Sequence, residues 1–193
     1  MDTKLSPAGR RELTKTQNRE TILDAARLVF AQLGFASATV RDIIRATPLA
    51  SGTFYNYFKS KEQVYQALRD EEALLLRPRL RHARGGATSA EDFIAEGFRT
   101  FFWFEVEKGE TGNERFRLDS PEVLAGFDEL RQDIQAAIDR GLLPVVDAGL
   151  LTVALSGLAF ELAEEVKRGA EVEKVTSFAT ALILGGLGGL SKT

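Results

Sequence analysis

Cysteine is absent from the 193 residues of this chain, and histidine occurs once, as His82. Without cysteine there can be neither a disulfide framework nor a thiolate. The lone histidine lies in a stretch rich in arginine and glycine, away from any metal-ligand or nucleophile–base motif. Adjacent acids such as Glu164 and Glu165 are most simply a solvated helix face. We therefore expect no cofactor, no metal and no enzymatic activity, and a cytoplasmic location.

Long apolar runs are also lacking. The most apolar uncharged stretch, Val175–Leu190, contains four glycines and is shorter than the roughly 20 residues that span a bilayer. The N-terminus has no apolar core of the kind found in signal peptides. We expect Val175–Leu190 to be a helix buried against protein, and we expect no membrane partner.

Proline is scarce, with five residues, and no run shows the alternation of apolar and polar side chains that is typical of strands. Apolar residues recur instead at helical spacing, for example over Thr16–Leu33. The sequence predicts an all-α fold of about nine helices. Three are small, a long connecting helix ends or kinks at Pro78, and about five follow. Residues 1–13 are expected to form a loose polar arm.

The net charge of −3 is unevenly distributed. Residues 1–64 contain ten Lys/Arg and six Asp/Glu, a net charge of +4, whereas the remaining fifteen Lys/Arg and twenty-two Asp/Glu give −7. A basic unit on an acidic body suits a protein that directs one end toward a polyanion. Because the excess is modest, the argument depends on the motifs within residues 1–64.

The stretch from Thr39 to Lys61 is typical of two short helices joined by a tight turn. Thr39 and Asp42 match a capping box that begins the first helix, which should end just before Pro48. The second helix, about Ser51–Phe58, carries small, hydroxyl-bearing and aromatic side chains rather than core residues. Such a helix has little to bury but can bond phosphates and base edges, which points to DNA.

This region resembles the tetracycline-repressor (TetR) family of bacterial transcription regulators. The family's G-T-[apolar]-Y-x-[Y/H]-F recognition helix is matched by Gly52–Phe58, and its first-helix pattern is matched over Arg19–Ile43. The similarity covers about residues 16–68. It implies that residues 1–64 form an N-terminal arm and a three-helix, helix-turn-helix DNA-binding domain. It also implies that residues 65–193 form a helical ligand-binding and dimerisation domain.

The resemblance also implies a set of DNA contacts. Arg41 suits a guanine edge or a phosphate, Asn56 can pair bidentately with adenine, and Lys61 lies where a helix N-terminus can help hold phosphate. Ordinary roles stay open for several positions, such as capping by Thr39 and core packing by Tyr57. The basic arm side chains can enter the minor groove or simply add charge. The predicted contacts are Thr39, Arg41, Ser51, Gly52, Thr53, Tyr55, Asn56, Tyr57 and Lys61, and the basic arm residues are Lys4, Arg10, Arg11 and Lys15.

Two residues in the turn depart from the family pattern. Pro48 stands where glycine is usual and cannot adopt a positive φ, and Ala50 stands where a capping serine is usual and has no capping oxygen. The turn must therefore close differently, and Thr47 or Ser51 can supply substitute hydrogen bonds. These departures leave an alternative function open, a helical dimeric interaction protein with a degenerate DNA-binding head.

The resemblance further implies an effector pocket among the middle helices. Four consecutive aromatic residues, 101–104, cannot all face one way, so some must line a cavity, a partner surface or water. Core packing is the ordinary interpretation of any single ring. We expect a small, largely apolar effector whose binding releases a repressor from a palindromic DNA operator. The residues expected around the effector are Phe98, Phe101, Phe102, Phe116 and Phe127.

The last two predicted helices, about 146–168 and 171–190, combine small and apolar residues. Small residues permit close helix approach, and an exposed apolar stripe requires a partner. A symmetric homodimer is consistent with the family and with a palindromic operator, whereas burial within one chain is the alternative. The residues expected at the dimer interface are Ala154, Gly157, Leu158, Glu161, Phe178, Ala181, Leu182 and Gly185.

Overall fold

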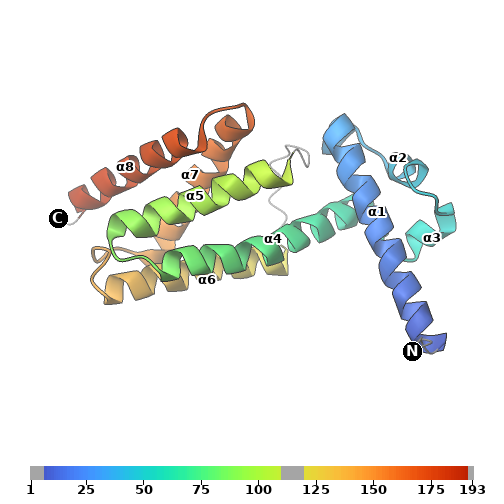
Figure 1. Cartoon of the computed structure of the whole chain (residues 1–193), viewed down its shortest axis with the longest axis horizontal. Helices are drawn as coiled ribbons and strands as arrows, with labels where there is room; N and C mark the ends of the chain where they lie inside the picture. The colour runs from blue at the N-terminus through green and yellow to red at the C-terminus, as the bar shows by residue number, and fades with distance from the viewer. Residues whose placement is uncertain (1–6, 110–119, 191–193) are drawn as a thin grey trace, which may run out of the picture. The chain divides into compact units, whose positions relative to one another are not determined.

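The computed structural model describes residues 7–109 and 120–190 (Figure 1). These residues form eight α-helices and no strand, so the predicted all-α class is confirmed. Four helices follow the long fourth helix within this range, where about five were expected. The helices are α1 (Pro7–Ser37), α2 (Val40–Arg45), α3 (Ser51–Tyr55), α4 (Lys61–Gly85), α5 (Ala90–Lys108), α6 (Pro121–Asp139), α7 (Ala148–Lys167) and α8 (Val172–Leu190).

The chain divides into two compact units, and among the described residues the division falls inside α4, after Arg69. The N-terminal unit contains α1, α2, α3 and the first turns of α4. The C-terminal unit contains the rest of α4 together with α5, α6, α7 and α8. The domain boundary predicted from the sequence, between residues 64 and 65, lies in the same helix.

One apolar core holds the N-terminal unit together. Each of its four helices contributes a side chain that is almost completely buried: Phe30 from α1, Ile43 from α2, Phe54 from α3 and Val64 from α4. Burial of large apolar side chains contributes roughly 1.5–3 kcal/mol each. The short helices α2 and α3, which would be unstable alone, therefore take their stability from this core.

The first half of α1 extends beyond that core. The helix begins at Pro7, whereas its first buried side chain is Ile22. The predicted loose arm is therefore wrong from Pro7 onward, and residues 1–6 lie outside the described range. Good helix formers such as Glu, Leu, Lys, Gln and Arg dominate this segment, which explains why it is helical without apolar periodicity. The helix bends at Gly34, whose φ of 72° and ψ of 154° suit glycine alone.

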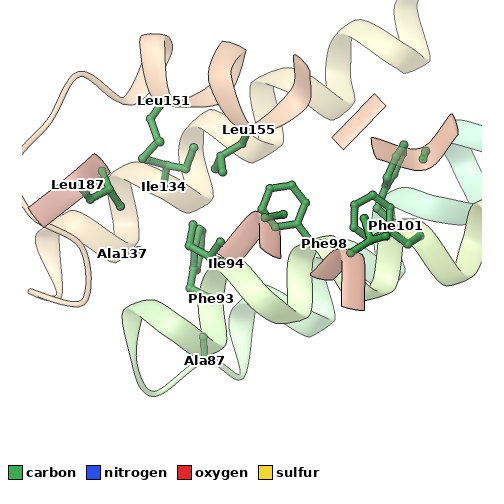
Figure 2. Close-up of a cluster of buried hydrophobic side chains, with 14 of the residues drawn as sticks. Ala87, Phe93, Ile94, Phe98, Phe101, Ile134, Ala137, Leu151, Leu155 and Leu187 are labelled. Atoms are coloured by element: carbon green, nitrogen blue, oxygen red, sulfur yellow. The ribbon is translucent and has the colours of Figure 1, made fainter. Parts of the chain in front are cut away.

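In the C-terminal unit, α5 packs against α7 and α8, and α7 also packs against α6. Figure 2 shows Phe98 of α5 turned toward Ile134 of α6 and Leu155 of α7, with Leu187 of α8 in the same cluster. The apolar stretch Val175–Leu190 forms most of α8 and buries one face in this core, as expected.

Of the two outcomes predicted for Pro78, an end or a kink of the helix, the end does not occur, because α4 continues to Gly85. Arginines on both sides of Pro78 pair with carboxylates of α6. Arg77 bonds both Glu122 and Glu129, and Arg84 bonds Asp133 at 2.8 Å. These tertiary contacts hold the second half of α4 along α6 and offset the cost of about 3 kcal/mol that proline imposes inside a helix.

Candidate nucleic-acid interface

The first short helix begins at a fully formed capping box. The backbone N–H of Thr39 donates to the Asp42 carboxylate at 3.0 Å, and the Asp42 N–H donates to the Thr39 hydroxyl at 3.3 Å. The Thr39 hydroxyl also donates to Asp42 at 2.6 Å, and these bonds hold the pKa of the Asp42 carboxyl below its usual value. The predicted capping box is confirmed. It places Arg41 in the first turn of α2 with its side chain exposed.

The turn between α2 and α3 closes through Thr47. Its backbone N–H and its hydroxyl both donate to the Ile44 carbonyl, at 3.0 and 2.9 Å. The same hydroxyl accepts the Leu49 N–H at 3.2 Å. Within the described ranges, no residue other than glycine has a positive φ. Pro48 is therefore accommodated without a left-handed residue, and Thr47 supplies one of the substitute bonds that the sequence led us to expect.

Helix α3 is shorter than predicted, since it ends at Tyr55 rather than near Phe58. The N-cap residue Ala50, just before α3, makes no side-chain capping bond, as expected. At the other end the Tyr57 N–H donates at 2.9 Å to the carbonyl of Phe54, three residues earlier, and this bond closes the last turn. Phe54 is the only buried side chain of α3, so the helix is anchored at one point and presents its other faces outward.

Most of the predicted DNA contacts lie on that outward surface. Tyr55 is 48% exposed, and Tyr57 is half-buried against the apolar core of its unit, in line with the core-packing alternative. The polar, hydroxyl-bearing surface expected for α3 is thus largely exposed, and the DNA contacts themselves stay predictions. The exposed members are Thr39, Arg41, Ser51, Gly52, Tyr55 and Asn56, and Thr53 is half-buried.

Lys61 lies in the first turn of α4, as predicted, but its ammonium is bonded within the protein. Its ammonium donates to three backbone carbonyls, those of Phe35 at 2.7 Å, Ala36 at 3.1 Å and Ala38 at 2.9 Å. It also lies 4.5 Å from the centre of the Phe35 ring. An ammonium has three N–H donors, and all three are used here. The contacts therefore favour a structural role, in which Lys61 joins the start of α4 to the link between α1 and α2, over the predicted phosphate contact.

The predicted effector residues occupy an aromatic cluster. Phe98, Phe101 and Phe102 are buried, and Phe116 lies outside the described residues. Phe101 meets Phe160 of α7 edge to face at 5.4 Å, and Phe160 meets the half-buried Phe127 of α6 at 6.3 Å. Three helices thus contribute to one chain of rings. Phe160 was not among the predicted effector residues, because it lies in α7, a helix that the sequence analysis assigned to the dimer interface.

The run of four aromatics divides as expected. Phe101, Phe102 and Phe104 are buried, whereas Trp103 is 47% exposed. The Arg79 guanidinium lies 5.5 Å from the Phe104 ring centre, so this ring also has a cationic neighbour. Four consecutive rings on a helix cannot all share one side, and in this run the exposed ring is that of the tryptophan.

Two hydroxyls on α8 had no signal in the sequence. Thr176 and Thr180 lie one helical turn apart and are 2% and 5% exposed. Among the described residues, neither hydroxyl oxygen has a hydrogen-bond partner. Leaving a buried hydroxyl unsatisfied costs about 1–3 kcal/mol, so such a pair calls for an explanation. Threonine in an apolar helix usually bonds its own backbone, which is why the sequence did not single these residues out.

A buried ion cluster connects α4, α5 and α7. Glu105 accepts from Lys108 at 2.8 Å and from Lys167 at 2.9 Å, and Lys108 also meets Glu72 at 3.1 Å. Burial raises the pKa of Glu105, but the two ammonium groups more than offset this and hold it below its usual value. Glu105 therefore carries its charge between two cations, an arrangement suited to holding helices together.

The predicted dimer residues lie on exposed faces of α7 and α8. Phe178 is 58% exposed and Leu182 is 53% exposed, large fractions for such apolar side chains, while Leu158 is half-buried. Leu150 and Val153 extend the apolar surface along α7 and were missed by the sequence analysis. The other predicted residues are all exposed: Ala154, Gly157, Glu161, Ala181 and Gly185.

A known family matches the segment that contains the two short helices. The sequence profile described as "Bacterial regulatory proteins, tetR family" matches residues 22–68, the segment that contains the core of α1, the two short helices and the start of α4. Residues 22–68 therefore form a DNA-binding segment of the TetR family. The match includes the capping box, the turn and α3, so the resemblance predicted from these residues is confirmed.

Curated relatives are similar to this chain mainly in the N-terminal unit. An uncharacterized HTH-type transcriptional regulator of Haemophilus influenzae is 30% identical over 98 residues, which are 50% of this chain and 48% of the relative. The HTH-type transcriptional regulator UidR of Escherichia coli is 43% identical over 61 residues, 31% of each protein. The chain therefore spans half or less of the length of these relatives.

Solved structures extend the likeness of fold to the C-terminal unit. The fatty acid degradation regulator FadR of Bacillus halodurans has a TM-score of 0.71 at 23% identity, over 96% of this chain and 98% of FadR. FadR of Bacillus subtilis in complex with stearoyl-CoA has a TM-score of 0.70 at 21% identity, over 86% and 98%. RolR in complex with resorcinol has a TM-score of 0.67 at 19% identity, over 92% and 90%.

Helix α8 contains the most apolar uncharged stretch of the sequence. Among the residues that the structure describes, none of the helices combines the length and the apolarity needed to cross a bilayer. The apolar character of α8 is explained in part by its inner face, which is buried in the core of the C-terminal unit.

Proposed function

We propose that this protein is a TetR-family, DNA-binding transcriptional regulator that represses transcription as a homodimer on a palindromic operator. The observation that carries the proposal is the surface of α3. One buried ring, Phe54, anchors the helix, while Ser51, Tyr55 and Asn56 are exposed. Hydroxyl and amide groups on a short, well-supported helix can bond phosphates and base edges in the major groove.

Selection of bound duplexes from a random pool tests this function. A dimeric repressor should enrich an inverted repeat whose half-sites lie about one helical turn apart or a multiple of it. The alternative, a helical interaction protein with a degenerate head, predicts no enrichment even at low salt. The closed turn at Thr47 supports the first function, because the departures at Pro48 and Ala50 leave α3 in place.

Arg41 provides a sharper test of base recognition. Replacing it with alanine should relax the preference at one base pair in each half-site by about tenfold, since a good arginine–guanine pair discriminates by roughly 1–3 kcal/mol. Arg45, exposed in the last turn of the same helix, gives a matched control that removes the same charge. Repeating the duplex selection with both variants measures the change. Unaltered preference in the Arg41→Ala selection would leave only a backbone role for Arg41.

The effector that releases the repressor is proposed to be small and largely apolar. The chain of rings through Phe101, Phe160 and Phe127 supports an apolar body. The unpartnered hydroxyls of Thr176 and Thr180 support one or two polar atoms on the ligand. Two compounds bound by proteins of this fold, stearoyl-CoA and resorcinol, are suitable probes because one has a long saturated chain and the other has two hydroxyls on a ring.

Valine at position 176 or 180 separates a ligand role from a purely structural one. Each change replaces a buried hydroxyl with a methyl group of similar shape, so the free energy of unfolding should rise by about 1 kcal/mol. Affinity for a hydroxyl-bearing effector should fall about tenfold, measured as the concentration that releases the operator. Ser177→Ala, on the exposed side of α8, is the matched control. Higher stability with an unchanged effector response would remove these hydroxyls from the effector site.

A further inference from the structure

The first half of α1 projects from the N-terminal unit, and none of its described side chains before Ile22 is buried. Between Pro7, where the helix begins, and Ile22, its first buried residue, the axis rises by about 22 Å at 1.5 Å per residue. Figure 1 shows this end of α1 running past α3. Arg19 marks where the projection leaves the core, because its guanidinium lies 5.8 Å from the ring centre of Phe58, just beyond α3.

Two basic residues of this projection lie on the core-facing side of the helix. Arg11 and Lys15 precede Ile22 by eleven and seven residues, close to three and two full turns, so all three share one face. Ile22 packs in the core with α2, α3 and α4. The face that meets the DNA-contacting helices further along α1 therefore continues outward as a basic stripe, which we define as Arg11 and Lys15.

The charges around the stripe are arranged asymmetrically. Glu20 lies nine residues after Arg11, on the opposite side of the helix, and Glu12 is a quarter turn away from Arg11. Both stripe residues are exposed, and neither makes an ion pair within the described ranges. An exposed basic face is often only a solvated surface. Here it continues the side of α1 that packs on the short helices, which gives it a specific neighbour.

We propose that Arg11 and Lys15 bind backbone phosphates of the duplex just outside the half-site contacted by α3. This inference rests on the proposed DNA-binding function and deepens it. A helix is about 10–12 Å wide with its side chains, whereas the minor groove is about 6 Å wide, so α1 cannot enter it. We therefore assign the stripe to the sugar–phosphate backbone, rather than to the minor groove or to unspecific charge, the two alternatives that the sequence left open. The two cations extend the footprint without reading additional bases.

The salt dependence of operator binding tests the stripe. Changing both Arg11 and Lys15 to alanine should lower the magnitude of the slope of log K against log salt by about 1.8, since each lost phosphate contact contributes about 0.9. Hydroxyl-radical protection should be lost outside the half-site, and the base preference should not change. Because both side chains lie beyond the core, the melting temperature should match that of the unaltered protein.

Two controls make the result specific. Arg27→Ala removes a cation from another face of α1, where the guanidinium is paired with Asp24 at 2.6 Å, and should leave the slope unchanged. Trimming the duplex to the inverted repeat should abolish the difference between the double variant and the unaltered protein. An unaltered slope and unaltered flanking protection in the double variant would overturn the stripe while leaving the proposed function intact. Failure of the unaltered protein to bind any duplex would overturn both.

Discussion

Methionine in place of Lys61 is expected to destabilise the N-terminal unit by at least about 2 kcal/mol and to leave the salt slope of DNA binding unchanged. The substitution keeps an apolar stem beside the Phe35 ring but removes three charge-assisted bonds to the carbonyls of residues 35, 36 and 38. Hydrogen bonds to charged groups each contribute about 1.5–3 kcal/mol, less where water reaches them. Urea unfolding at several temperatures measures the loss of stability.

Lys59→Met is the matched control for this loss. The Lys59 ammonium donates to one carbonyl, that of Tyr55, at 2.7 Å, and its side chain is exposed. Its loss should therefore cost a fraction of the effect at position 61. If Lys61 instead held a phosphate, the methionine variant would keep its stability and lose about 0.9 from the slope. That pair of results would restore the role inferred from the family pattern and contradict the structural one.

The position of Lys61 also links stability to recognition. The last carbonyl that Lys61 binds is that of Ala38. It directly precedes Thr39, the N-cap of the helix that carries Arg41. Releasing these carbonyls frees the chain that positions α2 against the rest of its unit. We therefore expect the methionine variant to bind all duplexes more weakly by a similar factor, without a change in base preference, in contrast to Arg41→Ala.

Glutamate in place of Leu182 is expected to convert the protein to a monomer and to weaken operator binding at least 100-fold. Leu182 is 53% exposed on α8, in the middle of the proposed dimer interface. By symmetry each dimer would bury two new carboxylates, and each uncompensated charge costs several kcal/mol. Sedimentation at micromolar concentration should give the mass of one chain, 21.2 kDa, instead of twice that value.

Two further variants separate association from folding. Leu74→Glu introduces the same charge on α4 at a leucine that is also 53% exposed, and it should leave the dimer intact. Gly185→Ala adds a Cβ that would meet nothing within 4 Å in the single chain, so a weaker dimer with an unchanged fold would indicate a partner at this position. If Leu182→Glu retained twice the chain mass and full operator affinity, the dimer interface would have to lie elsewhere.

Features encoded within a few neighbouring residues could be predicted from the sequence. The Thr39–Asp42 capping box, the uncapped start at Ala50 and the substitute bonds of Thr47 all involve groups no more than four residues apart. Their geometry follows from local backbone and side-chain chemistry, so a pattern of letters is sufficient. The same holds for the exposed polar surface of α3, because one buried ring in five residues leaves little else to bury.

Features that depend on distant partners could not be predicted. The carbonyl partners of Lys61 lie 23 to 26 residues earlier in the chain, and the carboxylates that support α4 beyond Pro78 lie on α6. The unpartnered state of Thr176 and Thr180 depends on the surroundings of α8 in the folded unit. None of these relations leaves a periodicity or a motif in the sequence.

The amino-acid sequence alone determined the helical class, the family of the N-terminal unit and the chemistry of its outward surface, because these depend on local propensity, apolar spacing and short-range capping. Only the tertiary structure decided which cation holds the backbone, how far α1 projects beyond its core, and which hydroxyls remain without a partner. These outcomes depend on which groups the fold brings within a few ångströms of each other, and that proximity is a property of packing rather than of sequence order.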